Sequence, residues 1–281
     1  MITRRQILGL LAGSGAARGL RGAELSFALD HFKLRVANLD KSVAFYYSLF
    51  GGPLSEVQGG SFPSPPDLKA IFFKIGSGKT YLILSPPDPK VPVGLEHVAI
   101  DAAAMAIVKE HGLPLAFPDQ SYVRDPDGNL LELVGTGYWN QPERVGRSPQ
   151  LPRELSSRTP VFEPLEIQRV ILRVSDLDRA AGFYRLFASE IGGSVARGLR
   201  NFDLQGTTLE LVTAPSPGLF GFTVSVRKFE EARVRRALKA LSIAFLPSSR
   251  GTLAFYDPDG TLVGVDSTRP PAPVERPGRI D

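Results

Sequence analysis

The sequence contains no cysteine and only three histidines among its 281 residues. Disulfide bonds and thiolate metal ligands are therefore excluded, and a transition-metal site would have to be built from histidine and carboxylate side chains. Dense basic runs interleaved with aromatic residues are also absent, and the formal net charge is only +4. This modest charge argues against nucleic acid as a partner.

An apolar stretch near the N-terminus, Leu10–Ala17, is too short to cross a lipid bilayer. It follows the pair Arg4-Arg5 and is rich in alanine and glycine. A charged start, a short apolar run and small residues are typical of a secretory signal, and the arginine pair resembles a twin-arginine signal. We therefore expect residues 1–23 to direct export to the periplasm, and the mature chain to have no membrane span. The alternative is an amphipathic helix of the mature protein, which the glycines in this segment disfavour.

The rest of the chain contains one pattern twice, and this repeat is its most informative feature. Residues 29–46 and 167–184 each begin with an alternating apolar run that predicts a strand, turn through Asn/Asp-Leu-Asp, and continue as a helix with Phe-Tyr on its apolar face. Residues 125–132 and 257–264 each begin with Asp-Pro-Asp-Gly, a tight turn in which proline fixes one φ and glycine supplies a positive one. Each turn leads into a final strand.

Between this opening and this close, each copy contains two further strands and a second strand–helix unit, so that each domain is interpreted as two βαβββ modules. We expect strands at 68–75, 81–85 and 95–100 with a helix at 102–111 in the first copy, and strands at 201–204, 208–213 and 220–226 with a helix at 229–241 in the second. The expected organisation is a signal at 1–23, domains at 26–135 and 165–267, a linker at 136–164, and a disordered tail at 268–281.

The opening pattern together with the Asp-Pro-Asp-Gly-x-x-x-Glu close resembles the vicinal oxygen chelate superfamily. That superfamily includes glyoxalase I, extradiol dioxygenases, bleomycin-resistance proteins and fosfomycin-resistance transferases. The resemblance covers about residues 29–134 and 165–265, which is most of the chain after the expected signal. It implies an α+β fold of two tandem domains, in which paired βαβββ modules form a cupped mixed sheet. It also implies metal ligands that point inward from the first and last strands of the modules.

Three residues of the first domain occupy the ligand positions that this resemblance implies, namely His31, His97 and Glu132. The fourth position is Ile83, or Leu82 if the strand register shifts by one, and neither side chain can bind metal. A lone strand histidine is usually structural, but two of the three histidines and a carboxylate are expected to converge inside one cup, where a divalent cation would stabilise the carboxylate. The third histidine, His111, is expected near a helix C-terminus and is interpreted as structural.

A site of two histidines and one carboxylate leaves coordination positions open for substrate or O₂. Such sites favour Fe(II) or Mn(II), with Zn or Ni as alternatives. An open site of this kind can chelate two adjacent oxygens of a small substrate and stabilise an enolate or catecholate. The expected partner is thus a small molecule, and the sequence leaves a homodimer open.

In the second domain the corresponding positions are Arg169, Glu210, Gly221 and Gly264, so that a metal site is not expected there. We predict that Arg169 and Glu210 form an ion pair in its place. The second domain would then be structural, or a lid over the first.

Two features bear on the chemistry. Tyr122 precedes the first Asp-Pro-Asp-Gly turn as in the extradiol dioxygenase motif, where it could orient a substrate oxygen or relay a proton. Two points argue against ring cleavage. Residues 112–121 contain no histidine for proton transfer. The resemblance to two-domain extradiol enzymes also implies the reverse domain order, with the metal site in the second domain. The sequence therefore favours a metal-dependent, dioxygenase-like enzyme, with a non-redox glyoxalase-like lyase or isomerase and a metal-free small-ligand-binding protein as alternatives.

Overall fold

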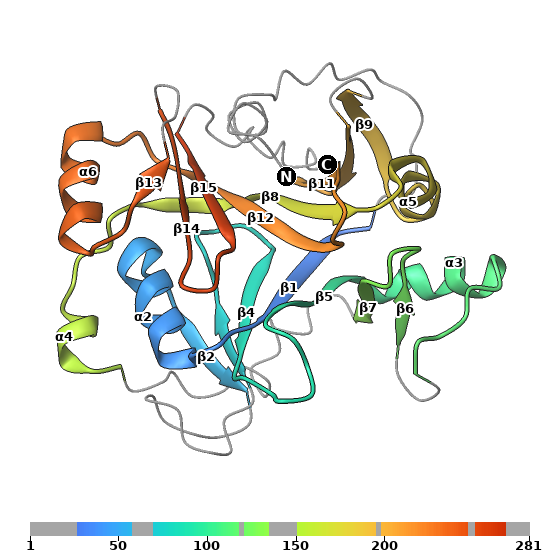
Figure 1. Cartoon of the computed structure of the whole chain (residues 1–281), viewed down its shortest axis with the longest axis horizontal. Helices are drawn as coiled ribbons and strands as arrows, with labels where there is room; N and C mark the ends of the chain where they lie inside the picture. Colours follow the sequence, from blue (N-terminus) through green and yellow to red (C-terminus); the bar gives the residue numbers. More distant parts are fainter. Residues whose placement is uncertain are drawn as a thin grey trace, which may run out of the picture.

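A computed structural model describes residues 27–57, 70–117, 121–134, 151–194, 198–246 and 251–267. The expected signal, the first half of the expected linker and the expected tail lie outside these residues. The described chain forms two large mixed β-sheets with few helices, in agreement with the predicted α+β class (Figure 1). We call residues 27–134, which carry the first sheet, the first domain, and residues 164–267, which carry the second sheet, the second domain. None of the described helices is long and apolar enough to cross a membrane.

The first domain has a seven-stranded sheet in the order β2-β3-β4-β1-β5-β7-β6. Its central strand β1 runs parallel to β4 on one side and antiparallel to β5 on the other. The elements are β1 (Leu29–Arg35), α2 (Leu39–Phe50), β2 (Leu54–Val57), β3 (Ala70–Phe73), β4 (Tyr81–Ser85), β5 (Gly94–Asp101), the 3-10 helix η1 (Ala102–Ala104), α3 (Met105–Glu110), β6 (Tyr122–Arg124) and β7 (Leu130–Val134).

The second domain repeats this arrangement in an eight-stranded sheet, in the order β13-β14-β15-β12-β8-β11-β10-β9. Strand β8 corresponds to β1, because it runs parallel to β11 and antiparallel to β12. The elements are β8 (Pro164–Val174), α5 (Leu177–Tyr184), β9 (Ser189–Ser194), β10 (Leu199–Leu204), β11 (Thr207–Thr213), β12 (Gly218–Val226), α6 (Glu231–Ala240), β13 (Phe245–Leu246), β14 (Thr252–Tyr256) and β15 (Leu262–Asp266).

Part of the segment that the sequence assigns to a linker belongs to the packed structure. Helix α4 (Arg153–Ser156) packs against α2, and its Leu155 is buried. The backbone N–H groups of Val161 and Phe162 then donate to the carbonyl oxygens of Ser48 and Leu49 at the end of α2, at 3.1 and 2.9 Å. The apolar residues of this segment explain the difference, because their burial stabilises an ordered path.

The repeated Asx-Leu-Asp turn begins a helix in both domains. The side-chain oxygen of Asn38 accepts a hydrogen bond from the backbone N–H of Lys41 at 2.9 Å, and that of Asp176 accepts one from Arg179 at 3.0 Å. Each side chain satisfies an amide that would otherwise have no partner in the first turn of its helix. The polar residue at this position of the repeat therefore fixes where α2 and α5 start.

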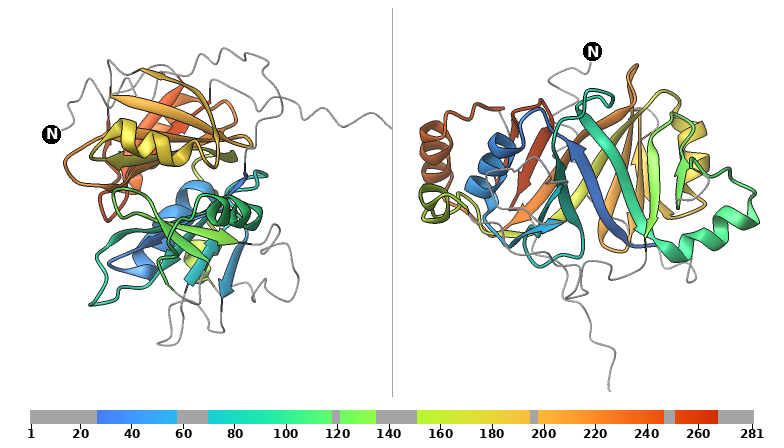
Figure 2. Two further views of the ribbon diagram at one scale, coloured as in Figure 1. Left: turned by 90° about the vertical axis from the view of Figure 1, so that its right-hand side faces the viewer. Right: turned by 90° about the horizontal axis from the view of Figure 1, so that it is seen from below.

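The two sheets share one apolar core. Alternate residues of β1, such as Phe32 and Leu34, are buried in it, and the ring of Phe32 lies 5.0 Å from that of Phe222 on β12, centroid to centroid. In the left view of Figure 2 the second domain lies above the first. Because strand side chains alternate between faces, His31 and Lys33 lie on the face of β1 that points away from this core. The described part of the second domain therefore packs on the face of the first sheet opposite His31 and Lys33.

Candidate metal centre

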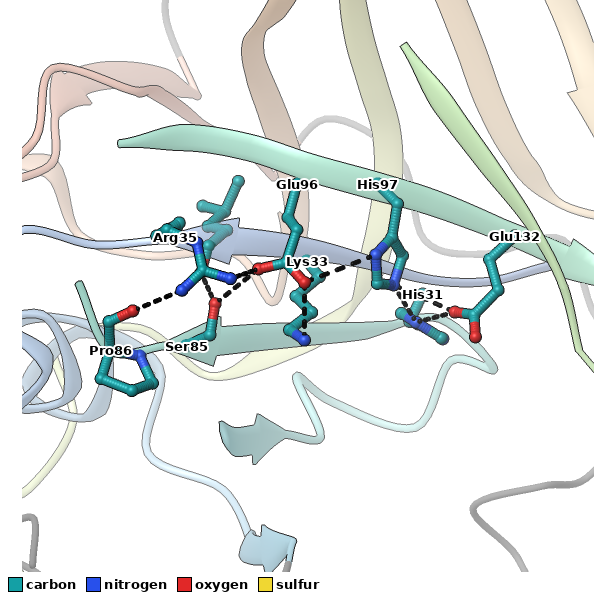
Figure 3. Close-up of polar contacts among 9 residues, drawn as sticks. His31, Lys33, Arg35, Ser85, Pro86, Glu96, His97 and Glu132 are labelled. Atoms are coloured by element: carbon teal, nitrogen blue, oxygen red, sulfur yellow. Dashed lines mark hydrogen bonds and ion pairs between the residues drawn. The ribbon is translucent and has the colours of Figure 1, made fainter. Parts of the chain in front are cut away.

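The structure brings His31, His97 and Glu132 to one point on three neighbouring strands, β1, β5 and β7 (Figure 3). The Nε2 atoms of the two histidines are 3.0 Å apart. The Glu132 Oε2 atom is 3.2 Å from Nε2 of His31 and 3.0 Å from Nε2 of His97. Both imidazoles are buried, whereas the Glu132 side chain is 21% exposed to solvent. The three ligand atoms thus form a nearly equilateral triangle with an open side at the carboxylate.

This triangle has the size that a single divalent ion requires. Ligand atoms about 2.1 Å from a metal ion and at right angles to one another are separated by about 3.0 Å. The observed separations of 3.0 to 3.2 Å match a facial arrangement on an octahedral ion. The side chains therefore fit a divalent metal without a change of backbone.

The charges of the three groups also suit a cation. Burial by itself would raise the pKa of the Glu132 carboxyl, but hydrogen bonds from His31 and His97 outweigh burial and hold this pKa well below its usual range. Burial lowers the pKa of His97. Burial also acts to lower the pKa of His31, but hydrogen bonds to Asp30 and Glu132 reverse the effect and raise it. The Glu132 carboxyl is thus held in its charged form, which is the form that binds a metal ion.

A charged cluster that sequence reasoning missed adjoins the triad (Figure 3). Lys33 and Arg35 follow His31 on the same face of β1, and both pair with the carboxylate of Glu96 on β5. The distance from Lys33 Nζ to Glu96 Oε1 is 2.8 Å, and Ser85 Oγ donates to Glu96 Oε2 at 3.0 Å. The period-two spacing of residues 31, 33 and 35 was the available signal for the two cations.

Tyr122 lies at the edge of the site, opposite Glu132 in the β6–β7 pair. Its ring contacts that of His97 edge-on, with centroids 5.5 Å apart, and it also contacts Phe117. The third histidine, His111, is exposed at the C-terminus of α3 and is not part of the cluster.

The fourth ligand position of the resemblance is apolar. Ile83 pairs with Lys33 in the β1–β4 register and packs with Ala70 and Phe72, whereas Leu82 belongs to the core shared by the two domains. The residue that faces the site is therefore Ile83, and the alternative register with Leu82 is excluded. Among the described residues, the side chains grouped to bind an ion here are therefore His31, His97 and Glu132.

The second domain has an ion pair in place of a triad. The Arg169 Nη1 atom lies 2.9 Å from Glu210 Oε2, which confirms the predicted pairing. Burial raises the pKa of Glu210 to about 7, against the opposing effect of Arg169. Gly221 takes the place of His97, and a Cβ atom there would lie 2.2 Å from the carbonyl oxygen of Leu262. Within the described part of this domain, no group of three metal-binding side chains is found.

Comparison with known proteins places the first domain in a family. Residues 28–133 match the family model described as the Glyoxalase/Bleomycin resistance protein/Dioxygenase superfamily. The solved homoprotocatechuate 2,3-dioxygenase of Arthrobacter globiformis is similar at a TM-score of 0.59 and 15% identity, covering 90% of this chain and 83% of that one.

Two further solved structures are each similar to this chain at a TM-score of 0.57. The Mn(II)-bound glyoxalase of Novosphingobium aromaticivorans is 17% identical, with 86% of this chain and 82% of that one covered. The 2,3-dioxygenase LapB of Pseudomonas sp. KL28 is 16% identical, with 87% of this chain and 93% of that one covered. No curated protein sequence matches this chain. At these identities the structural likeness shows the fold alone.

Proposed function

Because this chain belongs, through its first domain, to the glyoxalase/bleomycin resistance protein/dioxygenase superfamily, we propose that it is a divalent-metal-dependent enzyme acting on a small molecule with two adjacent oxygens. The observation that carries the proposal is the triangle of His31, His97 and Glu132, whose ligand atoms lie 3.0 to 3.2 Å apart. With Ile83 at the fourth position, the protein supplies three ligands and leaves the remaining positions to the substrate. We propose Fe(II) or Mn(II) as the metal, with Zn or Ni as alternatives.

When bound, the metal would supply Lewis-acid chemistry that favours negative charge on the substrate oxygens. The chain's own residues have distinct tasks. His31, His97 and Glu132 would hold the ion. Tyr122, whose ring is in edge contact with His97, would orient a substrate oxygen or carry a proton through its hydroxyl. Lys33, two residues after His31 on the same face of β1 and paired with Glu96, would place a positive charge near the substrate oxygens.

Dioxygenase-like chemistry is the first candidate, because a triad of two histidines and one carboxylate leaves room for both a bidentate substrate and O₂. The likeness of the fold to 2,3-dioxygenases agrees with this choice. A non-redox, glyoxalase-like lyase or isomerase is the second candidate, favoured by the equal likeness to a Mn(II)-bound glyoxalase. A metal-free binding protein would leave the close approach of two imidazoles and a carboxylate unexplained.

The test begins with the metal content of protein purified without oxygen, for the wild type, His97→Ala and His111→Ala. We expect close to stoichiometric metal in the wild type and in the His111→Ala control, and almost none in His97→Ala. Near-zero metal in all three would contradict a metal enzyme. Oxygen uptake by the Fe(II)-loaded protein with catechol then separates the two chemistries, because a lyase or isomerase consumes no O₂.

Two parts of the proposal concern the whole molecule. We propose export to the periplasm through the twin-arginine-like segment at 1–23, which cell fractionation of the full chain can test. A homodimer is a further proposal, and the mass of the purified protein in solution decides it.

A further inference from the structure

Two β-bulges in the β1–β5 pair each insert one acidic residue directly before a histidine of the triad. Leu29 and His31 on β1 face consecutive residues of β5, so that Asp30 is the extra residue. Likewise His97 and Leu95 face consecutive residues of β1, so that Glu96 is extra on β5. A bulge breaks the alternation of a strand and can turn two successive side chains toward one face. Each bulge therefore allows an acid and the following histidine to meet.

The contact is direct at the first bulge. Asp30 Oδ1 lies 2.7 Å from Nδ1 of His31, while the Nε2 atom of the same ring points to Glu132 and His97. A carboxylate that accepts the Nδ1 proton fixes the ring orientation and leaves the Nε2 lone pair for a metal ion. The Asp30 side chain is only 15% exposed, so that water competes little for this hydrogen bond.

The contact is longer at the second bulge. Glu96 Oε1 lies 3.9 Å from Nδ1 of His97, and Lys33 and Arg35 hold the carboxylate in place from the other side (Figure 3). Glu96 thus acts on His97 chiefly through its charge and at longer range. Its effect on the ring should be weaker than that of Asp30.

The second domain provides an internal comparison. Strands β8 and β12 have bulges at the corresponding places, with Gln168 and Phe220 as the extra residues. The bulges therefore belong to the fold, since they persist where no metal triad exists. The acidic residues, in contrast, occur only beside the histidines.

We propose that Asp30 and Glu96 are positioning residues of the metal centre, with Asp30 fixing the Nδ1–H tautomer of His31 and Glu96 assisting His97. The inference rests on the proposed function, because it assigns these carboxylates to the metal ligands of that site. Neither residue belongs to the group of three side chains that would hold the ion. Their role is to keep both Nε2 atoms available to the metal.

The test measures the dissociation constant for Zn(II), by competition with a chelator, in Asp30→Ala, Asp30→Asn, Glu96→Gln and the control Gln168→Ala. We expect Asp30→Ala to weaken Zn(II) binding about 10- to 100-fold, the range typical of such outer contacts. Asp30→Asn should lose less, because its amide oxygen still accepts the Nδ1 proton. Glu96→Gln should show the smallest loss of the three, and Gln168→Ala should bind as the wild type does.

A second readout separates positioning from a general effect on folding. In the ¹⁵N spectrum of the Zn(II)-loaded protein, which has only three histidines, His31 should carry a slowly exchanging Nδ1 proton that Asp30→Ala loses. Wild-type affinity in Asp30→Ala, or an equal loss in Gln168→Ala, would overturn the role of Asp30, and wild-type affinity in Glu96→Gln would overturn that of Glu96. If Asp30→Ala does not fold, the near-isosteric Asp30→Asn and its spectrum decide. Failure of the wild type to bind Zn(II) would instead reject the proposed function.

Discussion

Tyr46 of the first domain donates its hydroxyl hydrogen to Asp257 of the second at 2.7 Å, and Tyr184 of the second donates to Asp125 of the first at 3.0 Å. Each tyrosine belongs to the Phe-Tyr pair of a repeated helix, and each aspartate opens an Asp-Pro-Asp-Gly turn. The two repeated motifs are thus partners of each other across the domain interface. The opening motif of each copy binds the closing motif of the other copy.

Removal of either hydroxyl should destabilise the fold by a similar amount. Tyr46→Phe and Tyr184→Phe each leave a buried carboxylate with one donor fewer, which costs about 1 to 2 kcal/mol of the free energy of unfolding. Urea denaturation measures the loss. Tyr47→Phe is the matched control, because within the described chain no hydrogen bond involves its hydroxyl. A loss confined to one of the two tyrosines would contradict the symmetric interface.

Stability should depend on pH through the buried Glu210. Burial raises the pKa of this carboxyl to about 7 in the folded protein, from an ordinary value of 4.5. A carboxyl whose pKa is raised on folding stabilises the protein below its unfolded pKa, and that contribution is lost as the pH rises through 7. We expect the wild type to lose roughly 2 to 3 kcal/mol relative to Glu210→Gln between pH 4.5 and 8.

Denaturation of both proteins across this pH range measures the difference. Other titrating groups cancel because they are common to both. Glu163→Gln serves as the control, since the Glu163 side chain is 70% exposed and should not alter the profile. Parallel profiles for the wild type and Glu210→Gln would mean that Arg169 keeps Glu210 ionised throughout.

Metal should stabilise the folded protein, and this stabilisation should require the carboxylate ligand. At a free metal concentration 100 times the dissociation constant, binding to the folded state alone adds about 2.7 kcal/mol. Glu132→Gln keeps the shape of the side chain and removes its charge, so Mn(II) should raise the melting temperature of the wild type and leave that of Glu132→Gln nearly unchanged. Glu110→Gln, at the exposed end of α3, should respond as the wild type does. An equal rise in Glu132→Gln would place the metal elsewhere.

Local patterns were sufficient to predict most strands and helices. The predicted strand at 81–85 coincides with β4, and the predicted helix at 229–241 contains α6. The short edge strand β6 and the ordered helix α4 were not predicted. Strand β6 has only three residues and is stabilised by pairing with β7, so it is too short to show a periodic pattern. Helix α4 is stabilised by packing on α2, which is more than 100 residues earlier in the chain.

The site shows the same division. Spacing and the family resemblance identified His31, His97 and Glu132, and the equivalent positions in the second domain predicted the pair of Arg169 and Glu210. Spacing and resemblance did not identify Asp30 and Glu96, because strict strand alternation would point an acid away from the histidine that follows it. Only the two bulges, which depend on how β1 pairs with β5, bring each acid to its histidine.

The amino-acid order by itself determined the repeated modules, the ligand types that remain without cysteine, and the loss of the triad in the second domain. Those properties depend on residue identity and on local periodicity, both of which are read along the chain. The tertiary structure decided the 3 Å triangle of ligand atoms, the sharing of Glu96 by Lys33 and Arg35, and the crossed tyrosine–aspartate contacts. These depend on strand register and on the packing of two sheets, where a shift of one residue would turn every side chain to the opposite face.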